Sequence, residues 1–319
     1  MTRVRLRRTG CLDDMAGRKT TDFALYTGSK SLIYLIHGVT GTPAEMHYLA
    51  KSLARQGWDV YVPTLPGHCT SLRDLVRASE QEWRMHVQQQ LSYARRHYSS
   101  VFVAGLSAGA LLALEASTVV PIDGVGVLSP TFKYDGWNTP WSHAILPLAM
   151  KLVPLRLQHL LFHIDGPPYG IKDPVLQARI GSAYHPAAIV REWWKERAAR
   201  LRAASEKSAY VPSAASNGYP IFPLRTLTEI DRLIRYVSTR LHCVHAPTLV
   251  IQAREDDMTS PRNADFVHER IASRHKEVRL LDDCYHVITV DQQKQAVVRH
   301  LHDFFGTHRD LGTHDACEA

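Results

Sequence analysis

Long apolar runs are missing from this chain of 319 residues. A membrane-spanning helix needs roughly 18 uninterrupted apolar residues. The nearest candidate, 144–162, is interrupted by Pro147, Lys151, Pro154 and Arg156, so we expect no stable membrane insertion. The first ten residues are basic, but no apolar segment follows them as a secretory signal requires. We therefore expect a flexible, basic N-terminus over 1–20, with an organellar transit peptide as the alternative.

Paired cysteines are missing as well. The five cysteines are odd in number and scattered, and none forms a C-x-x-C pair. This pattern argues against a disulfide framework and a zinc site, and it fits a reducing compartment. We expect a cytoplasmic protein with no metal and no cofactor.

An excess of acidic residues is also lacking, and the formal net charge is +7. The densest basic segment inside the chain is 191–207, which we interpret as a solvated helix face. No zinc-finger, RNA-binding or phosphate-loop pattern accompanies it, so no nucleic-acid partner is expected. Trp193 and Trp194 in this segment leave weak contact with a lipid surface as a minor alternative.

Short β-branched runs alternate with helical patterns along most of the chain. The runs are 31–36, 58–63, 100–106 and 122–128, and helices are predicted over 43–56, 81–98 and 108–118. The alternation resumes with strands at 247–253 and 277–281 and helices at 261–274 and 291–305. Such alternation predicts an α/β fold, with a mostly parallel sheet and helices on both faces.

The segment 131–245 interrupts this alternation. It contains no clear strand and is rich in tryptophan, proline and leucine. We expect an inserted helical cap over the carboxyl ends of the strands, where open α/β sheets hold their sites. The core would then comprise 21–130 and 246–308, with a flexible C-terminus over 309–319.

A serine stands at the corner between one predicted strand and the next helix. Ser107 is flanked by Gly105 and Gly109 in the G-x-S-x-G pattern. Glycines at these places allow close backbone approach around a sharp strand-to-helix turn that displays the serine hydroxyl. The pattern alone also occurs in ordinary turns, but here the strand and the helix are both present. We expect Ser107 to be a nucleophile.

A nucleophilic serine requires a base, an orienting carboxylate and donors for the oxyanion. Asp256 lies in the loop after strand 247–253, with Glu255 and Asp257 as competitors that spacing alone does not exclude. His286 lies in the loop after strand 277–281 and is the candidate base. An ordinary helix-capping role for the acids is the alternative.

The first strong strand ends in "HGVTGTP" at 37–43. A sharp turn at His37 and Gly38 would expose the backbone N–H of Val39. Together with the N–H of Ala108, which follows the nucleophile, it could bind a developing oxyanion.

Four stretches resemble the α/β-hydrolase superfamily, and within it the bacterial carboxylesterases and monoacylglycerol lipases. They are "IHGVTGTPAEMHYLAKSLARQGWDVYVPTLPGH", "VAGLSAG", "APTLVIQAREDDMTSP" and "CYHVITVDQQK". The resemblance implies an α/β-hydrolase fold with Ser107 as nucleophile, Asp256 as acid, His286 as base, and Val39 and Ala108 as oxyanion donors. The chain departs from the family pattern at Cys69, where glycine is common, and in its cap, which is longer than that of the small esterases.

The expected function is hydrolysis of a hydrophobic carboxylic ester through an acyl-enzyme on Ser107. The same residues could act on a thioester, lactone or amide, or transfer the acyl group to an alcohol. A non-catalytic ligand receptor on this scaffold is the alternative of a different class. The leucines of 146–161 are candidates to line an acyl pocket in the cap, with pure packing as the alternative.

Overall fold

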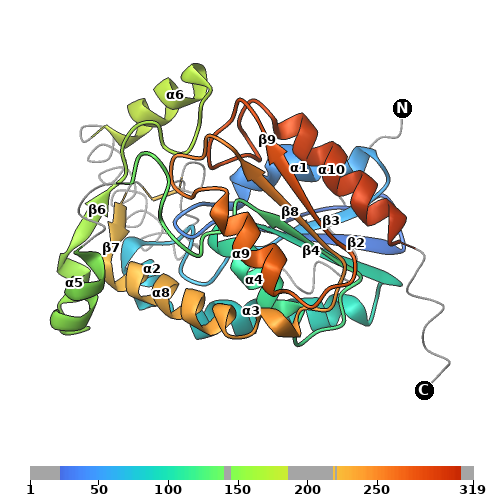
Figure 1. The fold of residues 1–319 in the computed structure, drawn as a ribbon, viewed down its shortest axis with the longest axis horizontal. Helices are drawn as coiled ribbons and strands as arrows, with labels where there is room; N and C mark the ends of the chain where they lie inside the picture. The colour runs from blue at the N-terminus through green and yellow to red at the C-terminus, as the bar shows by residue number, and fades with distance from the viewer. Residues whose placement is uncertain (1–21, 140–144, 186–217, 220, 310–319) are drawn as a thin grey trace, which may run out of the picture.

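The computed structural model describes residues 22–139, 145–185, 218–219 and 221–309. A seven-stranded sheet with the order β1-β3-β2-β4-β5-β8-β9 forms its centre (Figure 1). The strands are β1 (Phe23–Leu25), β2 (Ser31–Ile36), β3 (Asp59–Val62), β4 (Ser100–Leu106), β5 (Gly124–Leu128), β8 (Thr248–Ala253) and β9 (Lys276–Leu281). All neighbouring pairs are parallel except β1 with β3. The predicted mostly parallel sheet is confirmed, and β1 is an antiparallel edge strand that was not predicted.

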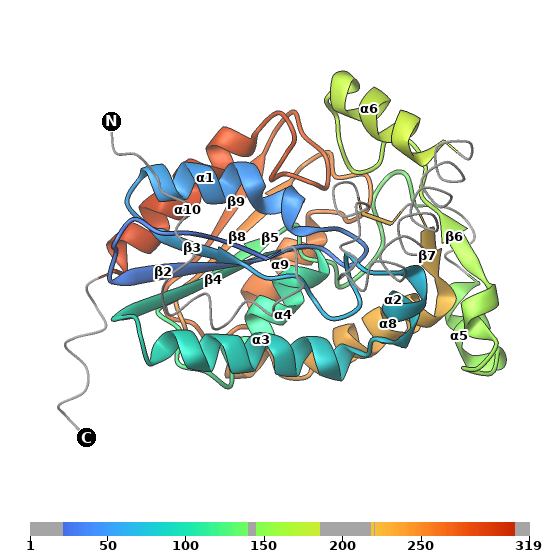
Figure 2. The same ribbon diagram turned by 180° about the vertical axis from the view of Figure 1, so that it is seen from behind.

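Helices cover both faces of this sheet, as Figures 1 and 2 show. One face carries α1 (His47–Arg55) and α10 (Lys294–Thr307), and the other carries α3 (Glu80–Arg95), α4 (Ala108–Ala116) and α9 (Arg262–Arg270). Two separate apolar clusters result, one on each face. Every residue of β2, β3, β4, β5 and β8 is buried, which explains their continuous apolar sequences.

Local sequence signals account for several helix starts. Ser79 caps α3, and Glu82 completes a capping box by accepting the Ser79 N–H at 2.8 Å. Asp173 caps α6 (Pro174–Tyr184) by accepting the N–H groups of Val175 and Leu176. A 3₁₀ turn, η1 (Pro43–Met46), precedes α1 and was included in the predicted helix 43–56. The short helix α2 (Leu72–Arg77) was not predicted.

The segment expected to be a helical cap contains strands. Its described part includes α5 (Leu146–Leu152), β6 (Phe162–Ile164), α6 and β7 (Ile221–Pro223). β6 and β7 pair antiparallel, with Ile164 opposite Ile221. The expectation of no strand in 131–245 is therefore wrong, because three-residue strands leave too short a pattern to recognise.

The expected end of the cap at 245 also differs from the structure. α8 (Leu224–Ser238) packs against α3 and α4, and its buried apolar residues belong to the cluster on that face of the sheet. Leu227, Ile230, Leu233 and Val237 are at most 6% exposed. This helix is part of the core layer. The sequence alone did not reveal this, because a basic, amphipathic helix with arginines on one face and leucines on the other is equally typical of a cap.

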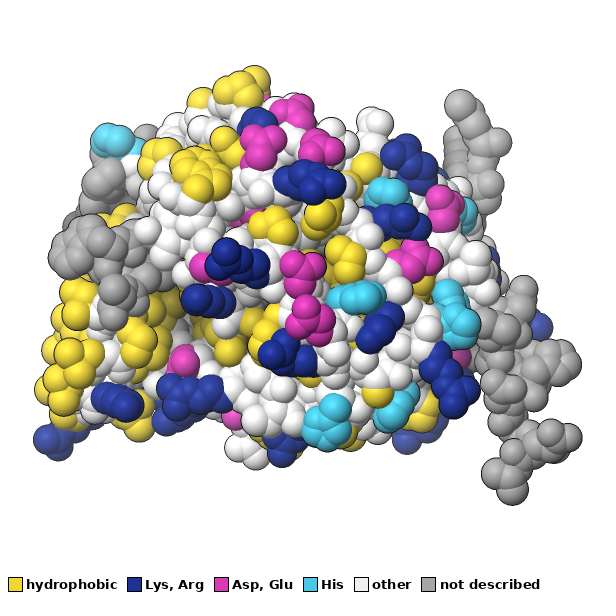
Figure 3. Space-filling model, in the orientation of Figure 1, with side chains coloured by type: hydrophobic (Ala, Val, Ile, Leu, Met, Phe, Trp, Pro, Cys, Tyr) yellow, Lys and Arg dark blue, Asp and Glu magenta, His cyan; other side chains and the backbone are white. Residues whose placement is uncertain are grey.

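Many leucines of the cap face outward. The exposed apolar side chains include Leu148, Leu152, Leu155, Leu160 and Leu161. They gather with Phe162 and Ile164 at one end of the molecule, over α5 and β6 (Figure 3). No helix in the described part of the chain is long and apolar enough to span a bilayer. Trp193, Trp194, the basic segment 191–207 and the termini 1–20 and 310–319 lie outside the described residues.

The close contact between α4 and the end of β2 predicts an unusual response to alanine. A Cβ at Gly109 would lie 2.5 Å from the Ile36 carbonyl oxygen and 2.6 Å from that of His37. Gly109→Ala should therefore lower the free energy of unfolding by about 1–3 kcal/mol, although alanine favours helices. Thermal and denaturant unfolding measure this loss.

Gly306→Ala in α10 is the matched control. Gly306 is exposed, and an added Cβ would meet no atom of the described residues within 4 Å. It should leave stability unchanged or raise it by up to about 1 kcal/mol. Equal effects at the two glycines would contradict the packing argument.

Candidate active site

Ser107 occupies the corner between β4 and α4. Its backbone has φ 58° and ψ −121°, a strained conformation that costs on the order of 1–3 kcal/mol for a residue other than glycine. A Cβ at Gly105 would lie 2.0 Å from the Gly109 carbonyl oxygen. Glycine at both positions thus allows the turn, and the serine side chain lies at the carboxyl edge of the sheet.

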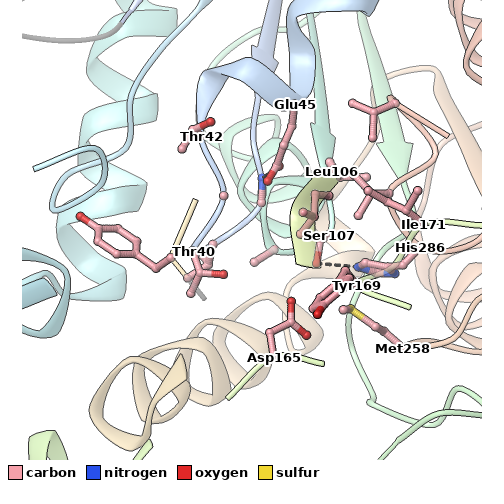
Figure 4. A pocket seen from close by; sticks show the side chains of 18 of the residues that line it. Thr40, Thr42, Glu45, Leu106, Ser107, Asp165, Tyr169, Ile171, Met258 and His286 are labelled. Atoms are coloured by element: carbon pink, nitrogen blue, oxygen red, sulfur yellow. Dashed lines mark hydrogen bonds between the residues drawn. The ribbon is translucent and has the colours of Figure 1, made fainter. Parts of the chain in front are cut away.

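Ser107, His286 and Asp256 form a continuous hydrogen-bonded row. Ser107 Oγ lies 3.0 Å from His286 Nε2, as the dashed line in Figure 4 marks. His286 Nδ1 lies 2.9 Å from Asp256 Oδ2 and 3.1 Å from its Oδ1. The side chains of His286 and Asp256 are 5% and 0% exposed. The structure therefore brings together three residues from three separate loops.

The three neighbouring acids of the β8–α9 loop have different partners. Asp257 accepts hydrogen bonds from the backbone N–H groups of Gly170, at 3.1 Å, and His286, at 3.4 Å. Glu255 pairs with Lys172 at 2.7 Å, and its side chain is 48% exposed. Only Asp256 contacts the His286 ring among these three. The structure thus distinguishes among the three carboxylates that sequence spacing left open as partners of His286.

The surroundings of Asp256 hold it as an oriented acceptor. Its Oδ1 accepts the N–H groups of Met258 and Thr259 at 2.9 and 2.8 Å, and its Oδ2 accepts Gln252 Nε2 at 2.7 Å. A carboxylate with these donors accepts the Nδ1–H of His286, which leaves Nε2 as the acceptor for the Ser107 hydroxyl.

Two opposing effects act on the pKa of His286. Burial of the ring disfavours its charged form and lowers the pKa, whereas the charge and hydrogen bond of Asp256 raise it. Asp257 and Glu45 act in the same direction as Asp256. The net result is a pKa above the ordinary value for histidine, so the ring can hold a proton taken from Ser107.

Thr131 is a site residue that the sequence did not reveal. Its Oγ1 lies 2.9 Å from Ser107 Oγ, and the residue is fully buried. It was assigned to the start of the cap, but it lies just after β5, which pairs with β4. A hydroxyl that follows a strand is too common to be recognised without this pairing.

The turn at residues 38–41 leaves one backbone N–H without an acceptor in the described part of the chain. The Gly38 N–H donates to Glu45 Oε2 at 3.3 Å, the Thr40 N–H to His68 Nε2 at 3.2 Å, and the Gly41 N–H to the Gly38 carbonyl at 3.1 Å. Within the described residues, neither Val39 nor Ala108 has a hydrogen-bond acceptor for its N–H. Both residues line the cavity beside Ser107.

Thr40 adopts a left-handed conformation in this turn, with φ 69°. A positive φ at the third position is typical of a type II turn, where glycine is preferred. Threonine therefore needs neighbours that hold it there. His68 is one of them, because burial lowers the pKa of His68 to about 4 and keeps its Nε2 an acceptor.

A cavity of about 360 Å³ opens over Ser107. Residues of the expected cap form much of its wall, including Tyr169, Ile171, Leu176, Ile180 and Tyr184. None of the leucines of 146–161 lines it. The hypothesis that they form an acyl pocket is wrong: all of them except Leu146 are exposed, and Leu146 packs against the core. Periodicity does not tell which face of a helix a neighbour covers.

Two carboxyl groups also point into this cavity (Figure 4). Burial raises the pKa of Glu45 to about 7 and that of Asp165 to about 6. Both interact electrostatically with His286. No group of three histidine, cysteine or acidic side chains that could hold a metal is found in the part of the chain that the structure describes.

The family model described as serine aminopeptidase, S33, matches residues 27–293. The chain belongs to this family. Its fold is the α/β-hydrolase fold, as the resemblance implied. A structure of a soluble variant of monoglyceride lipase from Saccharomyces cerevisiae, in complex with a substrate analogue, shares this fold with a TM-score of 0.68. That match has 15% identity and covers 97% of this chain and 96% of the other.

Two bacterial proteins are similar over most of this S33 chain. A thermostable monoacylglycerol lipase from Bacillus sp. (strain H-257) is 25% identical over 276 residues, which cover 86% of this chain and 90% of the lipase. A carboxylesterase from Bacillus subtilis (strain 168) is 22% identical over 281 residues, with coverage of 88% and 94%.

The raised pKa of Glu45 makes stability depend on pH. Its pKa in the folded protein, about 7, lies above the ordinary 4.5, so the folded state binds this proton more tightly than the unfolded chain. Its contribution to stability is then complete below pH 4.5 and is lost as the pH rises through 7. Glu45→Gln keeps an acceptor for Gly38 but cannot titrate.

Wild type should therefore lose stability relative to Glu45→Gln between pH 4.5 and 7. Chemical denaturation of both proteins at a series of pH values measures this divergence. Two curves that stay parallel would contradict the raised pKa.

Proposed function

We propose that this protein is a serine hydrolase that cleaves hydrophobic carboxylic esters through an acyl-enzyme on Ser107. The observation that carries the proposal is the row from Ser107 Oγ to His286 Nε2 and from His286 Nδ1 to Asp256, beside a cavity. The similarity to a monoacylglycerol lipase and a carboxylesterase supports esters as the substrate class.

The first step of this proposal is attack by Ser107 on the ester carbonyl. His286 Nε2 takes the hydroxyl proton as the Oγ–carbon bond forms, and the carbonyl oxygen becomes an oxyanion. The N–H groups of Val39 and Ala108, which have no acceptor among the described residues, would donate to it. His286 then gives its proton to the leaving alcohol as the ester bond breaks.

Water completes the cycle. His286 accepts a proton from a water molecule that attacks the acyl-enzyme, and it returns this proton to Ser107 as the acid leaves. Asp256 accepts the Nδ1–H of His286 throughout and holds the ring in the required tautomer. Thr131, at 2.9 Å from Ser107 Oγ, would orient the hydroxyl toward His286.

The lining of the cavity supports an apolar acyl or alcohol group. Ile171, Leu176, Ile180, Phe222 and Ile230 contribute apolar side chains to it, and each buried methylene contributes about 0.8 kcal/mol. These residues replace the leucines of 146–161 as our candidates for substrate binding. The tyrosines and carboxyls of the same cavity would contact the polar part of the ester.

We also keep the cytoplasm as the proposed location. Five scattered cysteines, odd in number, support a reducing compartment. Partners are limited in this proposal to the small-molecule ester, with neither nucleic acid nor a bound cofactor.

Ser107→Ala should reduce hydrolysis of nitrophenyl esters by about 10⁴- to 10⁶-fold, because the three residues act as one unit. The variant should keep its fold, as judged by circular dichroism and thermal melting. A fluorophosphonate probe should label wild type at Ser107 and should not label the variant.

Ser117→Ala, at the end of the same helix, is the control. Its hydroxyl donates only to the Leu114 carbonyl at 2.7 Å, so activity and labelling should match wild type. Retained activity in Ser107→Ala would refute the nucleophile.

Asp256→Asn should lower kcat by about 10⁴-fold at neutral pH, because an amide does not enforce the required His286 tautomer. It should also lower the pKa of His286, since the effect of burial would then be opposed only by Asp257 and Glu45. Rates at neutral pH and NMR titration of the imidazole measure both effects.

Asp257→Asn is the matched comparison, because Asp257 binds backbone N–H groups and not the ring. Its loss of kcat should be far smaller. If the two variants exchange these outcomes, the assignment of the acid is wrong.

A further inference from the structure

Two residues from the segment assigned to the cap contact the turn that carries Val39. The Tyr219 N–H donates to the Thr40 carbonyl at 2.8 Å. Gly218 precedes it with φ +75°, and a Cβ there would lie 2.7 Å from the Thr40 oxygen. The two backbones therefore meet directly, without a side chain between them.

The Tyr219 side chain adds a second connection to the same region. Its hydroxyl accepts the Thr70 N–H at 3.3 Å and donates to the Gly67 carbonyl at 3.4 Å. Between these two residues lies His68, whose Nε2 accepts the Thr40 N–H. These bonds form a closed circuit. Thr40 is bound to His68, the 67–70 loop that contains His68 is bound to the Tyr219 hydroxyl, and the Tyr219 N–H is bound to Thr40.

This circuit holds a residue that does not favour its own conformation. Thr40 is β-branched and has φ 69°, where glycine is preferred. Its N–H is bound from the core by His68, and its carbonyl is bound from the cap by Tyr219. Release of either bond would let Thr40 return toward negative φ and rotate the Val39–Thr40 and Thr40–Gly41 peptide groups. Val39 belongs to the first of these groups, so it would move as well and take its own N–H out of place.

We propose that Tyr219 is a positioning residue for catalysis, because its contact with Thr40 keeps the Val39 N–H directed at the oxyanion. The oxyanion hole is then complete only while Gly218 and Tyr219 are seated on the turn. This inference rests on the proposed role of Val39. It also joins the cap to the chemical step for every substrate, including acyl groups too short to reach the cap wall.

Two variants weaken the contact in different ways. Gly218→Ala places a methyl group against the Thr40 oxygen and strains the backbone, whereas Tyr219→Phe keeps the N–H donor and removes the hydroxyl bridge. Gly28→Ala is the control, because Gly28 has φ +85° and its added Cβ would meet nothing within 4 Å in the part of the chain that the structure describes. Gly28→Ala thus reproduces the positive-φ strain of Gly218→Ala, but at a position far from the site.

The measurements are kcat and KM for nitrophenyl acetate, and the inhibition constant of a trifluoromethyl ketone, whose hemiketal oxygen occupies the oxyanion site. Loss of a whole oxyanion donor costs about 100- to 1,000-fold in kcat. We expect a loss of about 10- to 100-fold for Gly218→Ala and a smaller one for Tyr219→Phe, with KM within about twofold. The inhibition constant should rise in parallel with the loss of kcat.

Hydrogen exchange at the Thr40 amide tests the same contact without any substrate. Its exchange should accelerate in both variants and stay unchanged in Gly28→Ala. Melting temperatures of the three proteins identify any loss of fold, and Tyr219→Phe, the milder change, keeps the test valid if Gly218→Ala unfolds.

Unchanged kcat, inhibition and Thr40 exchange in Tyr219→Phe and Gly218→Ala would overturn the positioning role. A rise in KM at constant kcat would also overturn it, since Tyr219 would then only contact substrate. A wild-type protein that hydrolyses no ester would count against the proposed function instead. Thr40 exchange would still report whether Tyr219 holds the turn.

Discussion

A contact between two stretches of backbone underlies the whole site. The chain changes from strand β4 to helix α4 at a single residue, so the first turn of the helix lies against β4 and the end of β2. Gly105 and Gly109 permit this approach, since a Cβ at either would overlap carbonyl atoms of the neighbouring segment. The same contact brings the His37–Gly41 turn beside Ser107, whose Cβ would be 3.6 Å from a Cβ built on Gly38. Nucleophile and turn are thus placed by one packing constraint.

The order of strands and helices in the core was predictable because the local signals agree with one another. β-branched runs of five to seven residues, separated by amphipathic helices, predicted the correct positions of β2, β3, β4, β5, β8 and β9. The meeting of Ser107, His286 and Asp256 followed from their loops, since parallel strands end at one edge of a sheet. Spacing could not separate Asp256 from its neighbours, because a difference of one residue decides which carboxylate reaches the ring.

What could not be predicted depends on contacts between distant segments. Thr131, Glu45 and Tyr219 carry no local pattern, and their importance comes only from what lies opposite them in the folded chain. The leucines of 146–161 were candidates for the cavity lining, with packing as the alternative, because their number suggested a buried face. Leu148 and Leu152 are instead 53% and 70% exposed. An amphipathic pattern indicates that a helix has an apolar and a polar face. Only the tertiary structure shows whether another part of the chain packs on the apolar one.

The pairing of β6 with β7 has a consequence for how this fold can vary. Ile164 and Ile221 are held opposite each other, so the segment between them, α6 included, closes a loop whose ends are fixed. The entropy of closing such a loop changes only with the logarithm of its length, by about 0.6 kcal/mol for each doubling. A change in the length of this segment therefore costs little in closure entropy, as long as Gly170, Gly218 and Tyr219 keep their contacts with the core. Because Tyr169, Leu176 and Ile180 come from this loop, substrate range can diverge while the chemical groups on the strands stay the same.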